Sequence, residues 1–529
     1  MNLSEEQFNP GWRILILELL VFGAFLVLAA RLVVTNVFSG SYYRNLSSGN
    51  LLREEKIPAN RGVIFDRNGN PLVINAPVYL SKSCLTDNCD AKVISKEEAM
   101  MSTESSVLTV RSYPYGAVFA HVLGYVTPAD RKGETGVEAE YDSLLAGRDG
   151  KNLYETNAVG AQVRSLGRVD PVPGQDLHLS LDLDLQKVLA ENLQNRPTAA
   201  VATDPQTGEI LALYSGPSFD PNLFTNLSTG AAWRDEAVKA LFSDSRQPLF
   251  NRAIGGTFPP GSTFKVVVSA AALESGAITG ETKIEDTGVL TVGKFTFSNW
   301  KWSRGGGTEG LLNIVGAIKR SNDIFFYKAG EATGAETITD WSKKFGLGQK
   351  LGIDLPGEAT GLVPDKAWRE ANARDWYLGD TYHLAIGQGD LLVTPLQVNA
   401  WTNVVANGGK LCRPQVLLGG KENCRGLGIK PENLALIKEG MVEACSPGGT
   451  GWPLFDYTVK GRKIQTACKT GTAEFGDPKD RTHAWFTVFA PAKNPQISLT
   501  VLVEAGGEGS DVAAPIAKKA LDVWFSDHQ

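Results

Sequence analysis

The longest hydrophobic stretch of the chain runs from Ile14 to Val34 and is interrupted only by Glu18 and Arg31. About 20 apolar residues cross a bilayer as a helix, and this stretch is longer than the apolar core of a signal peptide. We therefore predict an uncleaved transmembrane anchor over residues 14–35. Two alternatives stay open, because residues 27–29 also fit a cleavage site and the stretch would also suit a buried core helix.

Charged residues near this stretch leave its orientation open. Arg13 is the only positive residue before it, whereas Arg31 lies near its end and Arg44 and Arg53 follow it, so the positive-inside rule gives no support to either direction. Glu18 is costly inside a bilayer unless it meets a partner. It is therefore either a contact with another membrane protein or a carboxylate that reaches the membrane interface.

Between the anchor and residue 175 the pattern mixes strand and helix signals. Residues 59–70 predict a strand that enters a tight turn, because Asn-Gly favours hairpin turns. Residues 121–126 predict another strand, and residues 138–145 have apolar positions at helical spacing. We interpret residues 36–175 as one elongated module without obvious chemistry, and residues 1–13 as a short tail.

Residues 176–529 form one large predicted domain with strands at both ends. Strands are predicted over 177–181, 198–203, 210–214, 484–490 and 497–504, and helices over 184–195 and 512–524. The long middle is rich in helix signals. This order predicts an α+β fold in which helices flank an antiparallel sheet.

Composition narrows the classes of function. The 529 residues are 43% hydrophobic and 21% charged, which is typical of globular proteins. The net charge of −6 argues against a nucleic-acid-binding protein, which would show a basic excess. The five histidines are few and scattered, and the cysteines lack zinc-site spacing, so we predict no metal site and no cofactor.

The six cysteines could form disulfides if most of the chain lies outside the cell. The pairs would then be Cys84 with Cys89, Cys412 with Cys424, and Cys445 with Cys468. The first two pairs are local in sequence, and the third contains the cysteines that remain. Six buried free thiols are the alternative.

Candidate chemistry begins at Ser262. Prolines and Gly261 precede this serine and a helix-forming run follows it, which places it at a helix N-terminus. Lys265 lies three residues on, so both side chains share a face of the helix. A neutral lysine can take the serine proton, and burial or a second cation lowers a lysine pKa. The helix N-terminus favours the negative charge that develops there.

Two later elements support this S-x-x-K pair, which is weak evidence alone. Ser298 and Lys301 have the same spacing, yet they lack a helix signature and lie beside a glycine-rich loop. Ser321-Asn322-Asp323 lies on a predicted turn between helices at 312–318 and 324–329. Its hydroxyl can relay a proton, and Asp323 can orient lysines or a substrate amide.

The last element, residues 469–472, closes an apolar run that begins at Ile464 and predicts an edge strand. An edge strand can pair with a peptide, and a glycine within it permits a close approach to the backbone. Lys469 is expected to be catalytic, and the substrate-binding and oxyanion residues expected here are Thr470, Gly471 and Thr472.

Together these elements predict an acyl-transfer site. Ser262 is the expected nucleophile and Lys265 its base, and the backbone N–H groups of Ser262 and Thr472 form the oxyanion hole. Ser321 would carry the proton toward the leaving amine. Lys469 and Thr472 would hold a substrate carboxylate.

The order S-x-x-K, S-x-N/D and K-T-G resembles that of the penicillin-binding proteins and serine β-lactamases. Residues 61–69, 121–125 and 136–142 resemble the N-terminal module of class B penicillin-binding proteins, and residues 204–211 and 385–395 resemble their transpeptidase domain. The resemblance covers nearly the whole chain. It implies a serine D,D-transpeptidase that cross-links peptidoglycan stem peptides and is acylated by β-lactams.

Within that class, Asp323 and residues 251–253 and 483–486 resemble the elongation-type enzyme, and the division-type enzyme is the close competitor. The resemblance implies a cytoplasmic tail over residues 1–13 and an extracytoplasmic catalytic domain on the cell membrane. The implied partners are stem peptides, β-lactams, a membrane glycan polymerase and other wall-elongation proteins. Cys468 departs from the expected glycine, and a Cys445–Cys468 disulfide would pin the active-site strand to the preceding helix.

Two alternative functions use the same motifs. A membrane-bound β-lactamase or D,D-carboxypeptidase would use water as the acceptor. Against it, no glutamate is placed to activate a water, and the N-terminal module favours wall synthesis. A β-lactam sensor or a polymerase-activating scaffold would need no catalysis, but the complete motifs and the short tail speak against it.

Overall fold

The structure is a computed structural model that describes residues 11–43, 52–84, 89–102, 105–127, 131–156, 162–194, 196–225 and 231–527. Its contacts divide the chain into two compact units. One unit contains residues 1–60 and 147–174, and the other contains residues 61–146 and 175–529. The boundaries expected from the sequence, at residues 13, 35 and 175, stay predictions.

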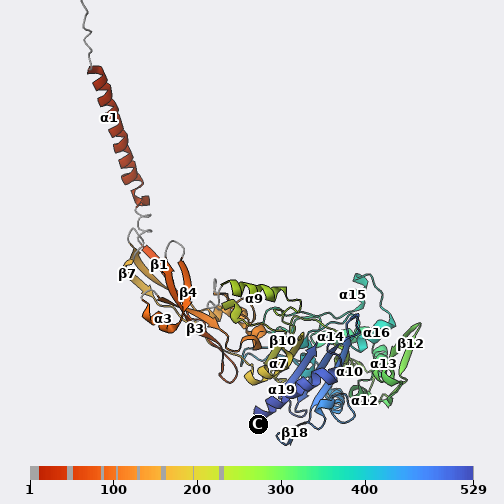
Figure 1. The fold of residues 1–529 in the computed structure, drawn as a ribbon. Coiled ribbons are helices and arrows are strands. Elements are labelled where there is room, and N and C mark those ends of the chain that lie inside the picture. Colours follow the sequence, from red (N-terminus) through yellow and green to blue (C-terminus); the bar gives the residue numbers. More distant parts are fainter. Residues whose placement is uncertain are drawn as a thin grey trace, which may run out of the picture. The chain divides into compact units, whose positions relative to one another are not determined.

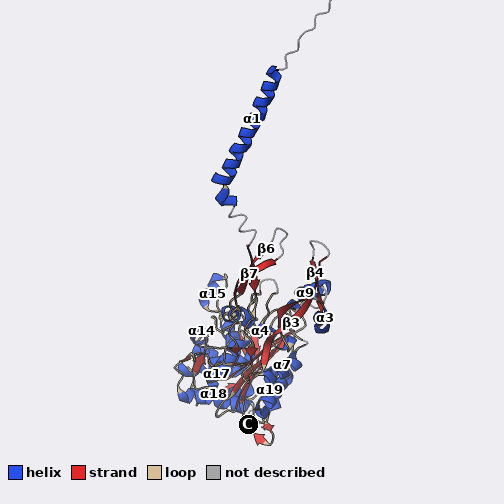
Figure 2. Cartoon of the chain, turned by 90° about the vertical axis from the view of Figure 1, so that its left-hand side faces the viewer, coloured by secondary structure: helices blue, strands red, loops and turns tan. Residues whose placement is uncertain are grey.

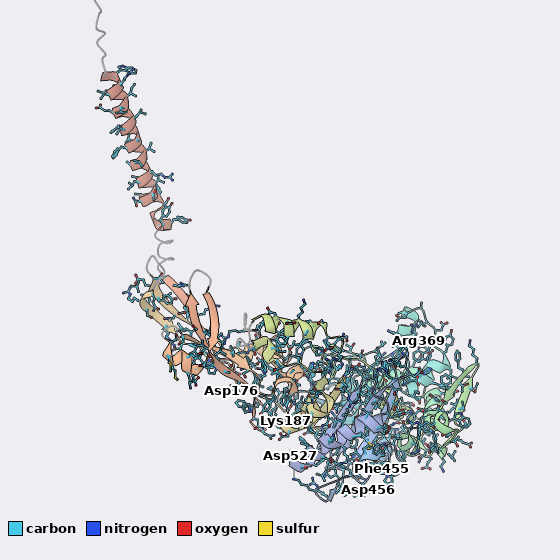
Figure 3. All side chains as sticks on the ribbon, viewed as in Figure 1. Asp176, Lys187, Arg369, Phe455, Asp456 and Asp527 are labelled. Carbon is cyan, nitrogen blue, oxygen red and sulfur yellow. A yellow bond between two sulfur atoms is a disulfide. The ribbon has the colours of Figure 1, made fainter. Side chains whose placement is uncertain are left out.

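The first unit contains the N-terminal helix α1 (Gly11–Val33), which continues into the π-helical turn η1 (Val34–Phe38). Its side chains project on all sides, and none is buried (Figure 3). Among the described residues it is the one helix that is long and apolar enough to cross a membrane. The same unit has a three-stranded antiparallel sheet with the order β1-β6-β7, formed by β1 (Leu52–Ile57), β6 (Gly150–Thr156) and β7 (Gln162–Val169).

The second unit is built on a five-stranded antiparallel sheet with the order β10-β9-β21-β20-β19 (Figure 1). Its strands are β9 (Thr198–Thr203), β10 (Ile210–Gly216), β19 (Ala467–Glu474), β20 (Thr482–Ala490) and β21 (Ile497–Val503). Strand β9, from the start of the predicted transpeptidase domain, pairs with β21, from near its end, and Val201 lies opposite Thr500. The expected antiparallel sheet and the edge position of the K-T-G strand are confirmed.

Helices cover both faces of this sheet (Figure 2). Helices α7 (Leu183–Leu193) and α19 (Ala514–Asp527) pack on one face, and α17 (Pro395–Ala406) packs on the other. Successive residues of one strand therefore enter different cores, as Ala200 and Val201 do. Burial on both faces explains why these strands are continuous apolar runs without polar alternation.

The remaining elements of the middle region are mostly helical. The helices are α8 (Asn222–Thr225), α9 (Ala231–Ser243), η3 (Gly261–Phe264), α10 (Lys265–Glu274), α11 (Trp300–Gly305), α12 (Ile314–Arg320), α13 (Asp323–Thr333), α14 (Ala335–Lys344), α15 (Lys366–Ala371), α16 (Leu378–Ala385), α18 (Pro431–Ala444), η4 (Trp452–Leu454) and η5 (Gly509–Ala513). The strand pairs are β11 (Ile284–Asp286) with β14 (Gly310–Leu312), β12 (Val289–Val292) with β13 (Phe295–Ser298), β15 (Lys410–Cys412) with β16 (Cys424–Gly426), and β17 (Thr458–Val459) with β18 (Arg462–Lys463).

The N-terminal part of the second unit has its own sheet with the order β4-β3-β2-β8, and β5 pairs with β3. Its strands are β2 (Ile64–Phe65), β3 (Pro71–Cys84), β4 (Cys89–Ile94), β5 (Ser105–Ser112) and β8 (Leu177–His178), and its helices are α3 (Lys96–Met101), η2 (Gly116–Val118), α4 (Ala120–Leu123), α5 (Gly136–Glu140) and α6 (Asp142–Leu145). The tight turn after Phe65 is present, with Gly69 at φ 84°.

The strand expected over residues 121–126 is wrong. Residues 120–123 form the short helix α4, which ends at Gly124 with φ 73°. A short apolar run fits a buried helical turn as well as a strand, and periodicity alone does not separate the two. Tertiary contacts decide here, because His121 is buried and its Nε2 lies 2.9 Å from the Pro248 carbonyl oxygen.

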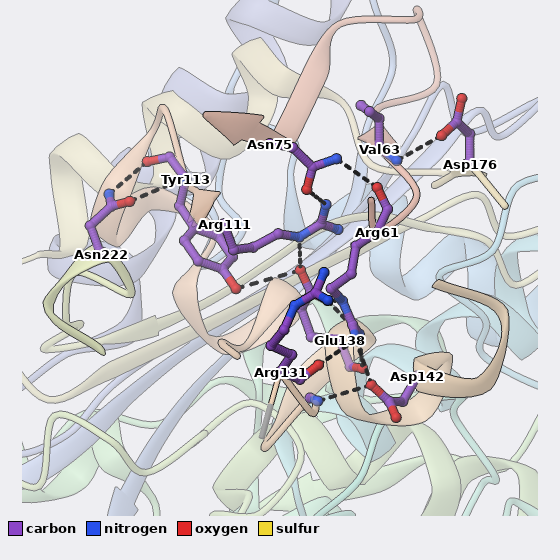
Figure 4. A network of polar contacts seen from close by, with 11 residues as sticks. Arg61, Val63, Asn75, Arg111, Tyr113, Arg131, Glu138, Asp142, Asp176 and Asn222 are labelled. Atoms are coloured by element: carbon purple, nitrogen blue, oxygen red, sulfur yellow. Dashed lines mark hydrogen bonds and ion pairs between the residues drawn. The ribbon is translucent and has the colours of Figure 1, made fainter. Parts of the chain in front are cut away.

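A buried ion-pair network joins the segments of this N-terminal part (Figure 4). Glu138 is fully buried and bonds Arg61 at 2.9 Å and Arg111 at 2.6 Å. Arg61 also bonds Asp142 at 2.8 Å. The Tyr113 hydroxyl lies 3.4 Å from Glu138, and burial together with that carboxylate raises the pKa of Tyr113 well above its usual value. Each buried charge in this network therefore lies beside an opposite charge that stabilises it.

We expect Glu138→Gln to lower the free energy of unfolding by about 3–5 kcal/mol, because two buried guanidinium groups lose their counter-charge. Chemical denaturation with a spectroscopic readout measures this effect. Glu336→Gln is the control, because Glu336 forms an exposed pair with Lys366 and its loss should change the stability by less than about 1 kcal/mol. Equal effects of both substitutions would contradict this interpretation.

Candidate active site

The candidate nucleophile Ser262 lies in the 3₁₀ turn η3, which leads directly into α10 at Lys265. In a 3₁₀ turn, side chains three residues apart stand one above the other. Gly261, at φ 54°, donates its N–H to the Gly387 carbonyl at 2.9 Å. The turn is thereby fixed, and Ser262 lines a cleft of about 780 Å³ while Lys265 is fully buried below it.

The Ser321–Asp323 turn joins α12 to α13 and holds Lys265. The Lys265 ammonium donates to Asp323 Oδ1 at 2.6 Å and to the Ser321 carbonyl at 2.8 Å, and it lies 3.4 Å from Ser321 Oγ. Ser321 has φ 52°, a strained conformation for a serine that is typical of functional sites. These hydrogen bonds direct the Lys265 ammonium toward residues 321–323, and it also lies 5.3 Å from the ring centroid of Phe326 in α13.

Lys469 approaches the same turn from β19. Its ammonium donates to Ser321 Oγ at 2.7 Å and to the Thr470 carbonyl at 3.0 Å. Lys469 is fully buried, whereas Thr470, Gly471 and Thr472 line the cleft. Lys469 therefore holds the Ser321 hydroxyl from the buried side, whereas Thr470 and Thr472 lie at the cleft.

Burial and charged neighbours shift the pKa of both lysines. Burial lowers the pKa of Lys265, and the neighbouring Asp323 carboxylate opposes this shift. Burial and the charge of Lys265 lower the pKa of Lys469 well below its usual value. For Lys265, burial thus favours the neutral amine, which is the form that a general base needs.

Gly471 lines the cleft and also packs against turn η3. A Cβ at this position would lie 3.0 Å from the Thr263 methyl and 3.1 Å from the Pro260 carbonyl oxygen. Turn η3, which carries Ser262, therefore comes close to β19 at Gly471. The expected close approach of a ligand to this glycine stays a prediction.

The structure places the second S-x-x-K pair differently. Ser298 ends β13, and helix α11 begins at Trp300, so the absence of a helix expected there is wrong. Lys301 donates to the Thr308 carbonyl at 2.8 Å, away from Ser298. The pair therefore lacks the arrangement seen at Ser262 and Lys265.

Two disulfides are present in the described part of the chain. Cys412 and Cys424 face each other across β15 and β16, and they are bonded. Cys445, at the end of α18, is bonded to Cys468, which directly precedes Lys469. The side chains of Cys84 and Cys89 lie outside the described residues.

Several residues at the site carry no motif signal. Asp286 accepts hydrogen bonds from the Asn299 and Asn322 side chains, both at 2.8 Å, and thereby supports the Ser321 turn. Glu474 and Glu508 line the cleft, whereas the sequence indicated no glutamate placed to activate a water. The Thr472 hydroxyl donates to Glu508 at 2.8 Å. Only the fold could have revealed these contacts, because they join segments far apart in the sequence.

Three segments thus bring a serine hydroxyl, two buried lysines and an edge strand to one cleft, which is the arrangement of a serine acyltransferase that acts on peptides. Comparison with protein families agrees. The model of the penicillin-binding protein transpeptidase domain matches residues 198–522, and that of the penicillin-binding protein dimerisation domain matches residues 80–179. The chain belongs to the penicillin-binding protein transpeptidases.

Its relatives indicate which type of penicillin-binding protein the chain is. Peptidoglycan D,D-transpeptidase MrdA of Acinetobacter baumannii is 33% identical, over 99% of this chain and 89% of the relative. Penicillin-binding protein 2 of Helicobacter pylori, solved in complex with MreC, has a TM-score of 0.78 at 30% identity, over 91% of this chain and 100% of that one. A peptidoglycan synthase complex that coordinates polymerization and crosslinking has a TM-score of 0.77 at 28% identity, over 98% and 99%. The chain is a penicillin-binding protein 2-like elongation transpeptidase.

A pH profile tests the role of Asp323 at Lys265. If neutral Lys265 is the base, acylation accelerates as the pH rises through the lysine pKa. Asp323 opposes the downward shift of that pKa, so Asp323→Asn should move the rising limb to lower pH. The measurement is the second-order rate constant of penicillin acylation as a function of pH. Asp365→Asn, at an exposed pair with Lys343, is the control and should leave the limb in place. A limb that stays in place or moves to higher pH in Asp323→Asn would refute the assignment.

Removal of the two disulfides should have different effects. Cys445→Ala with Cys468→Ala should lower the free energy of unfolding by about 2–5 kcal/mol and slow penicillin acylation, because Lys469 adjoins the lost bond. Cys412→Ala with Cys424→Ala is the matched control and should lower stability alone. Thermal melts and acylation rates at a temperature where both variants are folded separate the two effects. Equal acylation rates in the two double variants would rule out a role for Cys468 in positioning the strand.

Proposed function

We propose that the transpeptidase reaction proceeds through an acyl-enzyme at Ser262. Ser262 Oγ attacks the carbonyl carbon of the penultimate D-alanine, an ester bond forms, and the amide bond to the terminal D-alanine breaks. Lys265 takes the serine proton as the general base, and Ser321 passes a proton to the leaving amine. The amino group of a second stem peptide then attacks the ester, which releases Ser262 and forms the cross-link.

The observation that carries this proposal is the position of Ser321 between the two lysines. Its hydroxyl lies 3.4 Å from the ammonium of Lys265 and 2.7 Å from that of Lys469. A hydroxyl held between two amines can accept a proton from one side and donate one on the other. The ion pair of Lys265 with Asp323 then has to loosen when the lysine turns toward Ser262.

Charge stabilisation and substrate binding complete the proposed site. The backbone N–H groups of Ser262 and Thr472 receive the oxyanion, at the start of a helix and on an edge strand. The Thr472 hydroxyl receives the terminal carboxylate of the donor peptide. The buried Lys469 side chain orients Ser321 through its hydrogen bond to the Ser321 hydroxyl.

We further propose a single-pass topology in the cell membrane. Residues 1–13 form a cytoplasmic tail, residues 14–35 the anchor, residues 36–175 the N-terminal module, and residues 176–529 an extracytoplasmic transpeptidase domain. The exposed helix α1 supports the anchor. The MreC and synthase complexes of its relatives support wall-elongation partners that include a membrane glycan polymerase. Glu18 would contact such a partner within the membrane.

A cross-linking assay with the full chain in detergent tests the proposal. A donor pentapeptide that ends in D-Ala-D-Ala is mixed with an amine acceptor, and the products are separated by mass. We expect the donor–acceptor amide with release of D-alanine, and no product after treatment with penicillin. Release of D-alanine by water alone, at every acceptor concentration, would identify a carboxypeptidase instead.

A further inference from the structure

Glu508 makes a contact at the site that the reaction itself does not need. It directly precedes the π-helical turn η5, and its Oε2 accepts the hydrogen bond of the Thr472 hydroxyl at 2.8 Å. The position is fixed by close packing, because a Cβ at Gly509 would lie 2.5 Å from the Gly471 carbonyl oxygen. The Glu508 carboxylate therefore accepts the hydrogen bond of the Thr472 hydroxyl, which is the hydroxyl proposed to bind the carboxylate of the substrate.

The second oxygen of Glu508 is paired with Arg304 of helix α11. The Arg304 guanidinium lies 5.3 Å from the ring centroid of Trp300, on the same helix. Trp300 in turn donates its indole N–H to the Arg320 carbonyl at 3.0 Å, directly before the Ser321 turn. The Glu508–Arg304 pair thus links η5, beside β19, to α11, and both residues line the cleft.

We propose that Glu508 is a specificity-determining residue which occupies the Thr472 hydroxyl until the substrate carboxylate displaces it. This inference rests on the proposed function, which assigns Thr472 to that carboxylate. A threonine hydroxyl has one hydrogen to donate, so it serves one carboxylate at a time. Two carboxylates at one hydroxyl also repel each other. Substrate entry therefore moves Glu508 off Thr472, while Arg304 keeps its charge neutralised.

The displacement acts on anionic ligands and leaves neutral ones unaffected. A penicillin carries the carboxylate that would meet Thr472, and the methyl ester of the same penicillin lacks that charge. Both acylate through the same lactam carbonyl, whose C–N bond breaks as the Ser262 ester forms. A comparison of the two compounds therefore separates carboxylate displacement from the chemistry at Ser262.

Glu508→Gln tests the proposal, because it removes the charge and keeps the shape. We expect the second-order rate constant of acylation by the penicillin to rise about tenfold, the size of effect that one charge contact at partial exposure gives. The rate constant for the methyl ester should stay unchanged. Glu508→Ala, which also frees the hydroxyl, should raise the rate for the penicillin at least as much. The Glu508 side chain is 40% exposed and makes no hydrogen bond that caps η5, so both variants are expected to fold.

Asp511→Asn is the matched control. Asp511 lies on η5 and also lines the cleft, but it accepts hydrogen bonds from the Trp452 indole and Ser510 and not from Thr472. The same change of charge should leave the penicillin rate within about twofold. Equal acceleration by Asp511→Asn would show that the effect of Glu508→Gln comes from the net charge of the cleft and not from the contact with Thr472, and it would overturn the proposal.

Arg304→Gln adds a double-mutant cycle. Without its partner, the Glu508 charge should repel the penicillin more strongly, so the single variant should be slower than the wild type. The substitution should have little effect in the Glu508→Gln background. An unchanged or lower penicillin rate in Glu508→Gln, or an equal rise for the ester, overturns the proposal. Failure of the wild-type chain to be acylated at Ser262 would instead overturn the proposed function.

Discussion

Ser262→Ala is expected to abolish covalent labelling of the full chain by a fluorescent penicillin. The alanine lacks the Oγ that forms the ester, and the hydroxyl of the other motif serine already has a partner. Ser321 Oγ accepts the hydrogen bond of Lys469 at 2.7 Å. The stability should change little, because Ser262 is only partly buried and lines an open cleft. Labelling is measured by in-gel fluorescence after denaturation, which retains only covalent adducts.

Ser298→Ala is the matched control for this substitution. Ser298 lines the same cleft and begins the second S-x-x-K sequence. Its hydroxyl lies 2.8 Å from that of Ser303, and no lysine of its motif faces it. Labelling of the control should equal that of the wild type. Labelling that survives Ser262→Ala, or disappears in Ser298→Ala, would contradict the assignment of the nucleophile.

Lys265→Met should reduce the acylation rate constant by about 10³-fold, within the range that a general base contributes. Methionine fills a similar volume without a charge or a hydrogen-bond donor. The substitution also removes the ion pair with Asp323, whose Oδ1 lies 2.6 Å from the lysine ammonium. The measurement is the time course of penicillin labelling at saturating and limiting concentrations, which separates binding from acylation. The loss should appear in the acylation step.

Lys301→Met provides the comparison for Lys265→Met. Lys301 is 39% exposed and bonds the Thr308 carbonyl and Glu309 in its own segment. Its loss should leave the acylation step within about twofold of the wild type. A deficit below tenfold in Lys265→Met would show that another group takes the serine proton.

The sequence sufficed for those features of the site that depend on short spacings. The S-x-x-K spacing stacks Ser262 and Lys265 because it lies within one helical turn, and the Ser321 turn follows from the helix signals on either side. The edge position of β19 was also predicted from the sequence, because residues 469–472 close the apolar run that begins at Ile464. The central strands were predicted because burial on both faces leaves continuous apolar runs.

The rest depends on contacts between distant segments, which no local pattern records. Asp286 supports Asn322 from a separate strand, and Glu508 reaches Thr472 from the turn after β21. Residues 120–123 form a helix where a strand was expected. A short apolar run has only a weak preference for strand over helix, and the buried contacts of His121 decide between them. The buried state of Lys469 was likewise not predictable, since the same residue at an edge strand would face solvent in many folds.

The central claim is that Ser262 forms the acyl-enzyme, and peptide mapping of the penicillin-treated full chain tests it most directly. Intact-mass spectrometry should detect one penicillin adduct per chain, and proteolysis should locate it on the peptide that contains Ser262. The adduct should persist, because a transpeptidase without an amine acceptor releases its acyl group slowly. An adduct on another residue, or a penicillin that is hydrolysed without a persistent adduct, would contradict the account.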